Sequence, residues 1–226
     1  RLELALRCER PRPEEIDVQG RDEIARVART VHRYVDRINL NEQRILTINR
    51  ELDFLASHDA LTRLHNRRYF EQALAEGAES LLAGDYCAAM IDIDHFKQVN
   101  DLHGHAVGDR VIVQVACLIR DGLPDGALLA RYGGEEFAAL LPGVDMESAR
   151  ECLERIRQRV ADTPTAVEGG EVAVTVSIGL APRLPMGGFE HSLKAADESL
   201  YLAKRRGRNR LVLRPQRATD PSVETP

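Results

Sequence analysis

The sequence predicts an α+β fold in which helices pack against one central sheet, preceded by a long coiled-coil helix. From residue 58 to 213, short apolar segments alternate with amphipathic ones in the order helix, strand, helix, hairpin, helix, strand, helix, strand. From Gly20 to Ser57 there is no proline, and apolar residues recur every three and four positions. We therefore expect three parts, over 1–57, 58–213 and 214–226.

Composition narrows the class of protein. The chain has 226 residues, 43% hydrophobic and 30% charged, which is typical of a soluble globular protein with a real core. The net charge of −5 argues against non-specific electrostatic binding of nucleic acid. No apolar run approaches the roughly 20 residues that cross a membrane. The four cysteines lie far apart without a CxxC pair, so we expect reduced thiols and a cytoplasmic location, with neither disulfides nor a zinc site.

The first part has the pattern of a parallel two-stranded coiled coil. One set of seam positions holds Ile24, Val31, Ile38, Ile45 and Leu52, and the other holds Val27, Tyr34, Asn41, Ile48 and Leu55. β-Branched residues dominate the first set, which favours two parallel strands, and a buried asparagine in the second would fix the register. The alternative is an amphipathic helix packed on its own domain.

Upstream, Pro11 and Pro13 break any helix. The run EEIDVQGRDEIARVARTVHRYVDRI at 14–38 resembles the connector and second helix of a HAMP signalling module. The resemblance implies a parent protein anchored in the inner membrane as a sensor, with this chain as its cytoplasmic output. Because the chain begins with Arg1, we expect the sensor or membrane segment to be missing from it. The tail over 214–226 has three prolines and no apolar run, so we expect it to be disordered.

The elements of the second part follow one another without an internal repeat. Apolar residues three and four apart predict helices over 59–76, 108–121, 146–161 and 189–206. Short apolar runs predict strands at Cys87–Ile93, Leu128–Tyr132, Phe137–Leu141, 172–180 and Leu211–Leu213. Gly133 and Gly134, between the second and third of these strands, predict a hairpin. The valines from 172 alternate with small or polar residues, as in a half-buried strand.

Acidic side chains follow two of the predicted strands. Asp92 and Asp94 end one apolar strand, and Glu135 and Glu136 stand at the tip of the hairpin. Neighbouring strands lie about 4.8 Å apart, so two such ends can bring carboxylates together. Magnesium binds one or two carboxylates and completes its shell with substrate phosphates. Ordinary solvated strand ends are the alternative for either motif alone, but the two together with a basic pair indicate a metal site.

Basic residues and a short helix predict a phosphate site beside these acids. A helix that begins at Asp94 or His95 would leave its first backbone N–H groups free for phosphate, and Lys97 would add a positive charge. Lys204 and Arg208 are four residues apart, which would place both cations on one face of the last helix. A solvated basic stretch is the alternative.

Three polar residues suggest a pocket for a base. Asn100, His105 and Asp109 follow the predicted phosphate segment. A carboxylate only accepts hydrogen bonds, and guanine presents two adjacent N–H donors whereas adenine presents no such pair. Asp109 could equally cap a helix that begins at 108, and both interpretations stay open.

Several motifs, in order, resemble one known family. RYGGEEF at 131–137 resembles the signature of the GGDEF family, the diguanylate cyclases, in its GGEEF variant. The other matching segments are HDALTRLHNRRYF at 58–70, MIDIDHFKQVNDLHGHAVGD at 90–109, TVSIGLA at 175–181 and ADESLYLAKRRGRNRL at 196–211. The family's usual RxxD product-binding motif is absent, since PDGA stands at 124–127, so we expect no strong product inhibition through that site.

The resemblance implies a fold like the palm of nucleotide cyclases and polymerases, with a mostly antiparallel sheet and a ferredoxin-like core. It implies that two GTP condense into cyclic di-GMP and two pyrophosphates, at the interface of a homodimer because one domain binds one GTP. Asp92 and Glu135 would bind magnesium, or manganese, through their side chains, and Ile93 through its carbonyl. Glu135 would also be the base for the ribose 3′-OH, and Glu136 would have a lesser metal or base-reading role.

The resemblance also implies which residues contact the guanine base and which contact the phosphates of GTP. Asn100 and Asp109 would hold guanine, with His105 lining the same site. The residues implied to contact phosphates are Phe96 and Lys97, through the loop, and Lys204 and Arg208, through their side chains. The alternative function is a catalytically inactive module that binds GTP or cyclic di-GMP.

Overall fold

The computed structural model describes residues 23–76, 84–184 and 188–214. The chain divides into two compact units, Arg1–Leu55 and Ala56–Pro226. The connector of the HAMP-like segment and nearly all of the tail lie outside the described residues. No helix in the described ranges is long and apolar enough to cross a membrane.

The described part of the first unit belongs to one helix, α2, which runs over Glu23–Ser57. This confirms the predicted long helix. Val31 of the predicted seam is partly buried against Ala28. Seven other apolar side chains of the seam are exposed, with accessibilities between 52% and 62%: Val27, Tyr34, Ile38, Ile45, Ile48, Leu52 and Leu55. An exposed apolar stripe of this kind is the surface that a second coiled-coil strand covers.

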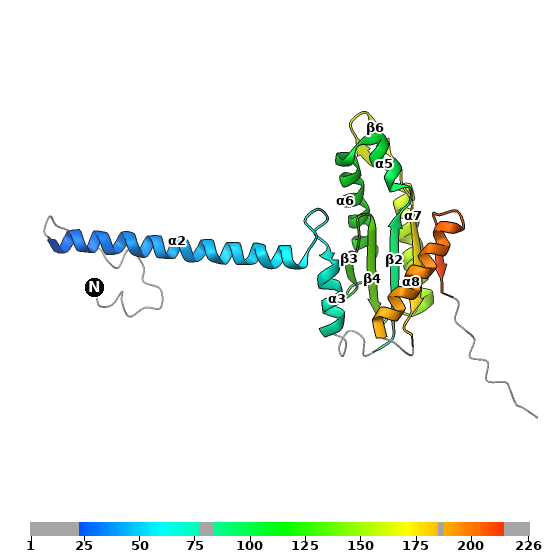
Figure 1. The fold of residues 1–226 in the computed structure, drawn as a ribbon, viewed down its shortest axis with the longest axis horizontal. Helices are drawn as coiled ribbons and strands as arrows, with labels where there is room; N and C mark the ends of the chain where they lie inside the picture. The colour runs from blue at the N-terminus through cyan, green and yellow to red at the C-terminus, as the bar shows by residue number, and fades with distance from the viewer. Residues whose placement is uncertain (1–22, 77–83, 185–187, 215–226) are drawn as a thin grey trace, which may run out of the picture. The chain divides into compact units, whose positions relative to one another are not determined.

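The second unit is built on a six-stranded sheet (Figure 1) with the strand order β1-β3-β4-β2-β7-β8. The strands are β1 (His65–Asn66), β2 (Tyr86–Ile93), β3 (Leu128–Arg131), β4 (Glu136–Pro142), β7 (Val176–Pro182) and β8 (Leu211–Leu213). The three central pairs are antiparallel, and the outer pairs β1–β3 and β7–β8 are parallel. The predicted α+β class with a mostly antiparallel sheet is confirmed.

Helices cover both faces of this sheet. The first face packs against α5 (Phe96–His103), α6 (His105–Gly122) and α7 (Met146–Asp162), and the second against α3 (Arg67–Glu76) and α8 (Gly188–Arg205). Strand β2 serves both cores because its side chains alternate: Ile91 joins the first core and Met90 the second. For that reason every residue of β2 is buried.

Gly179 allows α8 to lie directly on β7. A Cβ at this position would clash with the backbone of α8 at Ala196 and Leu200. A backbone cannot move aside as a side chain can, so this approach requires glycine. The close packing places the C-terminal end of α8, which carries Lys204, beside the end of β2.

The predicted helix over 59–76 is wrong in its first half. Residues before Arg67 form a turn and the short strand β1, and α3 begins only at Arg67. The carboxylate of Asp59 accepts hydrogen bonds at 2.8 Å from both the backbone N–H and the hydroxyl of Thr62. Such local side-chain bonds offer the backbone an alternative to the helix, and Arg63 adopts a left-handed φ of 61°.

The predicted half-buried strand over 172–180 is confirmed from Val176 onward, but its first residues and its half-buried character are wrong. Its first residues belong to β6 (Gly170–Val172), which pairs with β5 (Thr165–Val167) in a separate two-stranded sheet. The chain enters the main sheet at Val176, and β7 is buried on both faces. The alternating valines hide this break because Val174, which lies in neither strand, is buried as well.

Candidate functional site

The two predicted acidic motifs meet at one end of the sheet. In the register between β2 and β4, Asp92 lies opposite Glu136. The backbone N–H of Ile93 donates a hydrogen bond to the carbonyl of Glu135 at 3.2 Å. Asp92, Glu135 and Glu136 therefore come from two separate motifs to one place, as the strand pattern predicts.

Asp92 is a buried carboxylate that a cation neutralises. Its side chain is 8% exposed, and Oδ2 lies 2.7 Å from Nζ of Lys204. Burial raises the pKa of Asp92 to about 6; the Lys204 ammonium opposes this increase, while the charges of Glu135 and Glu136 add to it. Asp92 therefore needs a nearby positive charge, and Lys204 supplies one in this structure.

The donor set fits magnesium. It offers the carboxylates of Asp92 and Glu135, the neighbouring Glu136 and the backbone carbonyl of Ile93, all of them hard oxygens. Within the described ranges, no group of three or more His, Cys, Asp or Glu side chains is arranged to hold a metal ion alone. Magnesium in proteins commonly takes its remaining ligands from substrate phosphates and water.

The hairpin that carries the glutamates is held from two sides. A Cβ at Gly133 would lie 2.5 Å from Oε2 of Glu136, so glycine makes room for that carboxylate. The Arg131 guanidinium donates to the carbonyl of Gly134 at 2.7 Å, and to Oδ1 of Asp59 at 3.0 Å. Arg131 thereby ties the peptide before Glu135 to the turn that follows α2.

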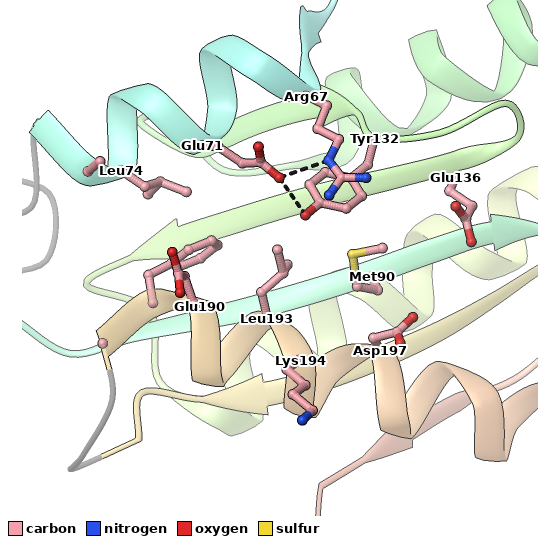
Figure 2. Close-up of a pocket in the computed structure, with 13 residues that line it drawn as sticks. Arg67, Glu71, Leu74, Met90, Tyr132, Glu136, Glu190, Leu193, Lys194 and Asp197 are labelled. Atoms are coloured by element: carbon pink, nitrogen blue, oxygen red, sulfur yellow. Dashed lines mark hydrogen bonds and ion pairs between the residues drawn. The ribbon is translucent and has the colours of Figure 1, made fainter.

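A cavity of about 800 Å³ adjoins the hairpin (Figure 2). Glu71 of α3 accepts hydrogen bonds from Nε of Arg67 at 2.8 Å and from the hydroxyl of Tyr132 at 2.9 Å. The Arg67 guanidinium lies 4.4 Å from the centre of the Tyr132 ring. These contacts brace the base of the hairpin against α3. Sequence reasoning missed them, although the four-residue spacing of Arg67 and Glu71 is a signal for an ion pair.

The short helix predicted in the phosphate segment is present, but it begins one residue after the later of the two predicted starts. Helix α5 begins at Phe96, after His95 with a φ of 57° and without a side-chain capping bond. The Phe96 side chain is buried, whereas Lys97 is exposed. Phe96 can therefore reach a ligand only through its backbone, and Lys97 can add its charge from the first turn of the helix.

The predicted guanine residues lie at the junction of α5 and α6. Asn100 packs against Gly108, where a Cβ would clash with its side-chain oxygen. His105 and Asp109 are exposed on the first turns of α6. Because α6 begins at His105, Asp109 lies within the helix, and its interpretation as a cap is wrong.

The two predicted cations do not share a helical face. Helix α8 ends at Arg205, so only Lys204 belongs to it. Gly207, Arg208 and Asn209 have positive φ values of 111°, 62° and 44°. Arg208 therefore projects from a left-handed turn after the helix, and the expectation of a common face is wrong. Lys204 faces the acids rather than standing apart as a solvated residue.

Asp94 has different partners from Asp92, although both end the same apolar run. Its two oxygens accept hydrogen bonds from the hydroxyls of Ser177 and Thr175 and from the backbone N–H of Asn209. No signal in the sequence connects Asp94 with Asn209, which lies far along the chain.

Known proteins are similar to this chain over most of its length. A family model described as "Diguanylate cyclase, GGDEF domain" matches residues 56–210. The chain is 38% identical over 186 residues to the diguanylate cyclase DgcP of Pseudomonas aeruginosa, which covers 78% of this chain and 27% of that protein. It is 37% identical over 205 residues to the response regulator PleD of Caulobacter vibrioides, which covers 88% of this chain and 42% of that protein. The chain thus spans less than half the length of these relatives.

A solved structure is similar in fold. It contains the coiled coil and GGDEF domain of DgcB from Caulobacter crescentus, in complex with c-di-GMP. The TM-score is 0.72 at 32% sequence identity, covering 81% of this chain and 99% of that one. A coiled coil followed by this kind of domain is therefore a known arrangement.

Proposed function

Since the chain belongs to the GGDEF family of diguanylate cyclases, we propose that it condenses two GTP molecules into cyclic di-GMP with release of two pyrophosphates. The observation that supports this most directly is the convergence of Asp92, Glu135 and Glu136 at the end of β2, shortly before the first turn of α5 with its exposed lysine.

Each condensation forms one phosphorus–oxygen bond and breaks another. The ribose 3′-oxygen of one GTP attacks the α-phosphorus of the other, and the bond from that phosphorus to the bridging oxygen of pyrophosphate breaks. Glu135 takes the proton of the 3′-hydroxyl, and two such steps close the ring. Asp92, Glu135 and the Ile93 carbonyl, with Glu136 in a lesser role, would hold magnesium or manganese. The bound ion supplies positive charge for the phosphate oxygens and lowers the pKa of the attacking alcohol.

The remaining residues bind and orient the nucleotide. Asn100 and Asp109 bind the guanine base, and His105 lines the same site. The groups that hold the phosphates are the backbone N–H groups of Phe96 and Lys97 and the cationic side chains of Lys97, Lys204 and Arg208. Positioning and electrostatics of this kind supply most of the rate in phosphoryl transfer.

The reaction needs two copies of the domain, because each binds a single GTP. The exposed apolar seam of α2 supports a parallel homodimer as the means of bringing them together. An upstream sensor would then act through α2 by shifting the population of productive pairings. The natural setting of this output unit is the cytoplasm, where its substrate GTP is found.

Incubation with GTP and Mg²⁺, followed by chromatography for cyclic di-GMP and a pyrophosphate assay, tests the proposal. We expect both products from the parent chain, and at least 100-fold less from Glu135→Gln, because the variant loses the base and a metal ligand. Glu147→Gln makes the same chemical change on the exposed face of α7 and should retain the parent's activity. No product from the parent at high protein concentration would contradict the proposal.

A further inference from the structure

We propose that Asp94 is a positioning residue that holds Arg208 at the phosphate site through the backbone N–H of Asn209. The proposal rests on the function above, in which Arg208 binds phosphate. It gives the second acid of the Asp92–Ile93–Asp94 sequence a role distinct from that of the first.

The hydrogen bonds of Asp94 are those of a structural anchor. The residue is 4% exposed. Its Oδ1 accepts from the Ser177 hydroxyl at 2.7 Å, and its Oδ2 accepts from the Thr175 hydroxyl at 2.7 Å and from the Asn209 N–H at 2.9 Å. Its own N–H donates to the Thr175 carbonyl at 2.9 Å. An ionised carboxylate accepts several hydrogen bonds and donates none, so this set of donors matches aspartate.

The turn that Asp94 holds has an uncommon backbone. Gly207, Arg208 and Asn209 all have positive φ, and two of the three have a side chain. Left-handed backbone at residues other than glycine persists only where the surroundings enforce it, and such residues cluster at functional sites. Arg208 lies in the middle of this turn, so its direction depends on the contacts that hold the turn.

Those contacts come from several elements. The Arg208 N–H donates to the Ala203 carbonyl of α8 at 3.0 Å, and Nη1 of Arg157 in α7 donates to Oδ1 of Asn209 at 2.5 Å. Asp94 adds the bond from the segment that directly follows β2. It therefore couples the turn of Arg208 to the strand that carries Asp92, and sets where the guanidinium lies relative to the acids.

Asp94→Asn is the sharpest change, because it keeps the shape and turns an acceptor into a donor. In one orientation the new NH₂ group faces the Ser177 hydroxyl, which must turn to accept; in the other it faces the Asn209 N–H, which cannot accept. We expect a rise of about tenfold in the KM for GTP and a smaller fall in kcat, since the altered residue displaces a binding group rather than a reacting one. Thr175→Val removes one donor without changing the volume much and should shift the KM in the same direction, by less.

A double-mutant cycle distinguishes positioning from general damage. If Asp94 acts through Arg208, Asp94→Asn should add little to Arg208→Ala, so the double variant should bind the triphosphate about as weakly as Arg208→Ala alone. Asp145→Ala removes the capping bonds of α7 and is the control for a loss of stability. It should leave the KM for GTP unchanged, both in the parent chain and in the Arg208→Ala background.

Binding is measured beside turnover, by calorimetry with a non-hydrolysable GTP analogue and by NMR titration with guanosine. Asp94→Asn should weaken binding of the triphosphate analogue and leave binding of guanosine unchanged. A merely structural defect would weaken binding of both ligands. If Asp94→Asn does not fold, the cycle is run with Thr175→Val. Three results would overturn the proposal: additive losses of triphosphate affinity in the Asp94→Asn and Arg208→Ala cycle, an equal loss of affinity for guanosine, or no loss of affinity in Arg208→Ala. A parent chain that binds the analogue without turnover would refute the cyclase, while the binding cycle would still decide the role of Asp94.

Discussion

At the scale of single residues, the pair formed by Asp59 and Arg131 fixes the position of the hairpin. The two side chains are 23% and 16% exposed, so the pair is partly shielded from water. Arg131 also holds the carbonyl of Gly134, and Asp59 holds the turn at Thr62. One carboxylate therefore supports both the turn at Thr62 and, through Arg131, the peptide before Glu135.

Asp59 should make the stability of the protein sensitive to acid. Burial raises its pKa, but the hydrogen bonds from Thr62 and the Arg131 guanidinium outweigh burial and lower it below 3.8. A lowered pKa in the folded state contributes stability above the unfolded value, and this stability is lost as the pH falls through the folded value. Asp59→Asn should cost about 1–2 kcal/mol at pH 7 and reduce the loss of stability between pH 5 and 3.

Urea unfolding at pH 7, 5 and 3, followed by circular dichroism, measures this effect. Glu168→Gln changes an exposed carboxylate in the turn between β5 and β6 and should leave the parent's pH profile nearly intact. If Asp59→Asn and the parent lost the same unfolding free energy on acidification, the assigned role of Asp59 would be wrong.

At the scale of elements, the contact between β7 and α8 is the tightest constraint described. Gly179→Ala should lower the free energy of unfolding by about 2–4 kcal/mol, because the new methyl group meets helix backbone that cannot move aside alone. Gly84→Ala is the matched control, since nothing lies within 4 Å of its added Cβ. Chemical denaturation of the two variants decides the point, and equal stabilities would contradict the packing.

The elements also show what a sequence reveals about this fold. Strands β2, β3 and β4 and helices α6 and α7 were predictable because apolar periodicity and the glycine hairpin are local signals. The turn at Asp59 was not predictable, because the hydrogen bonds of its side chain compete with the local helical pattern. The separate pair β5–β6 was not predictable either, because buried valines alternate without interruption from β6 into β7. In the site, the position of the acids after predicted strands indicated that Asp92 and the two glutamates lie close together. The proposed role of Asp94 could not be predicted, because its partner Asn209 is distant in the sequence.

At the scale of the whole molecule, the seam of α2 should control activity through dimerisation. Ile38→Lys combined with Ile45→Lys places like charges in the predicted interface, where they oppose association. We expect the variant to be monomeric and its turnover to fall by at least tenfold at micromolar protein, with partial recovery at high concentration. Sedimentation equilibrium and a series of rates against protein concentration measure this.

The matched control is Leu40→Lys combined with Thr47→Lys. These two positions have the same spacing and lie outside the predicted seam, so mass and turnover should stay those of the parent. Unchanged mass and activity in the seam variant would show that α2 is not the dimer interface.

The ion pair between Lys204 and Asp92 has a consequence for how the protein matures. A pocket of carboxylates normally resists assembly until an ion arrives, because the charges repel one another in a place with little water. Here a lysine from the chain itself occupies that role. Under the proposed function, newly made protein can therefore complete its fold without the divalent ion, and binding of the ion would be a later, reversible event. Chelation should then silence the protein without unfolding it.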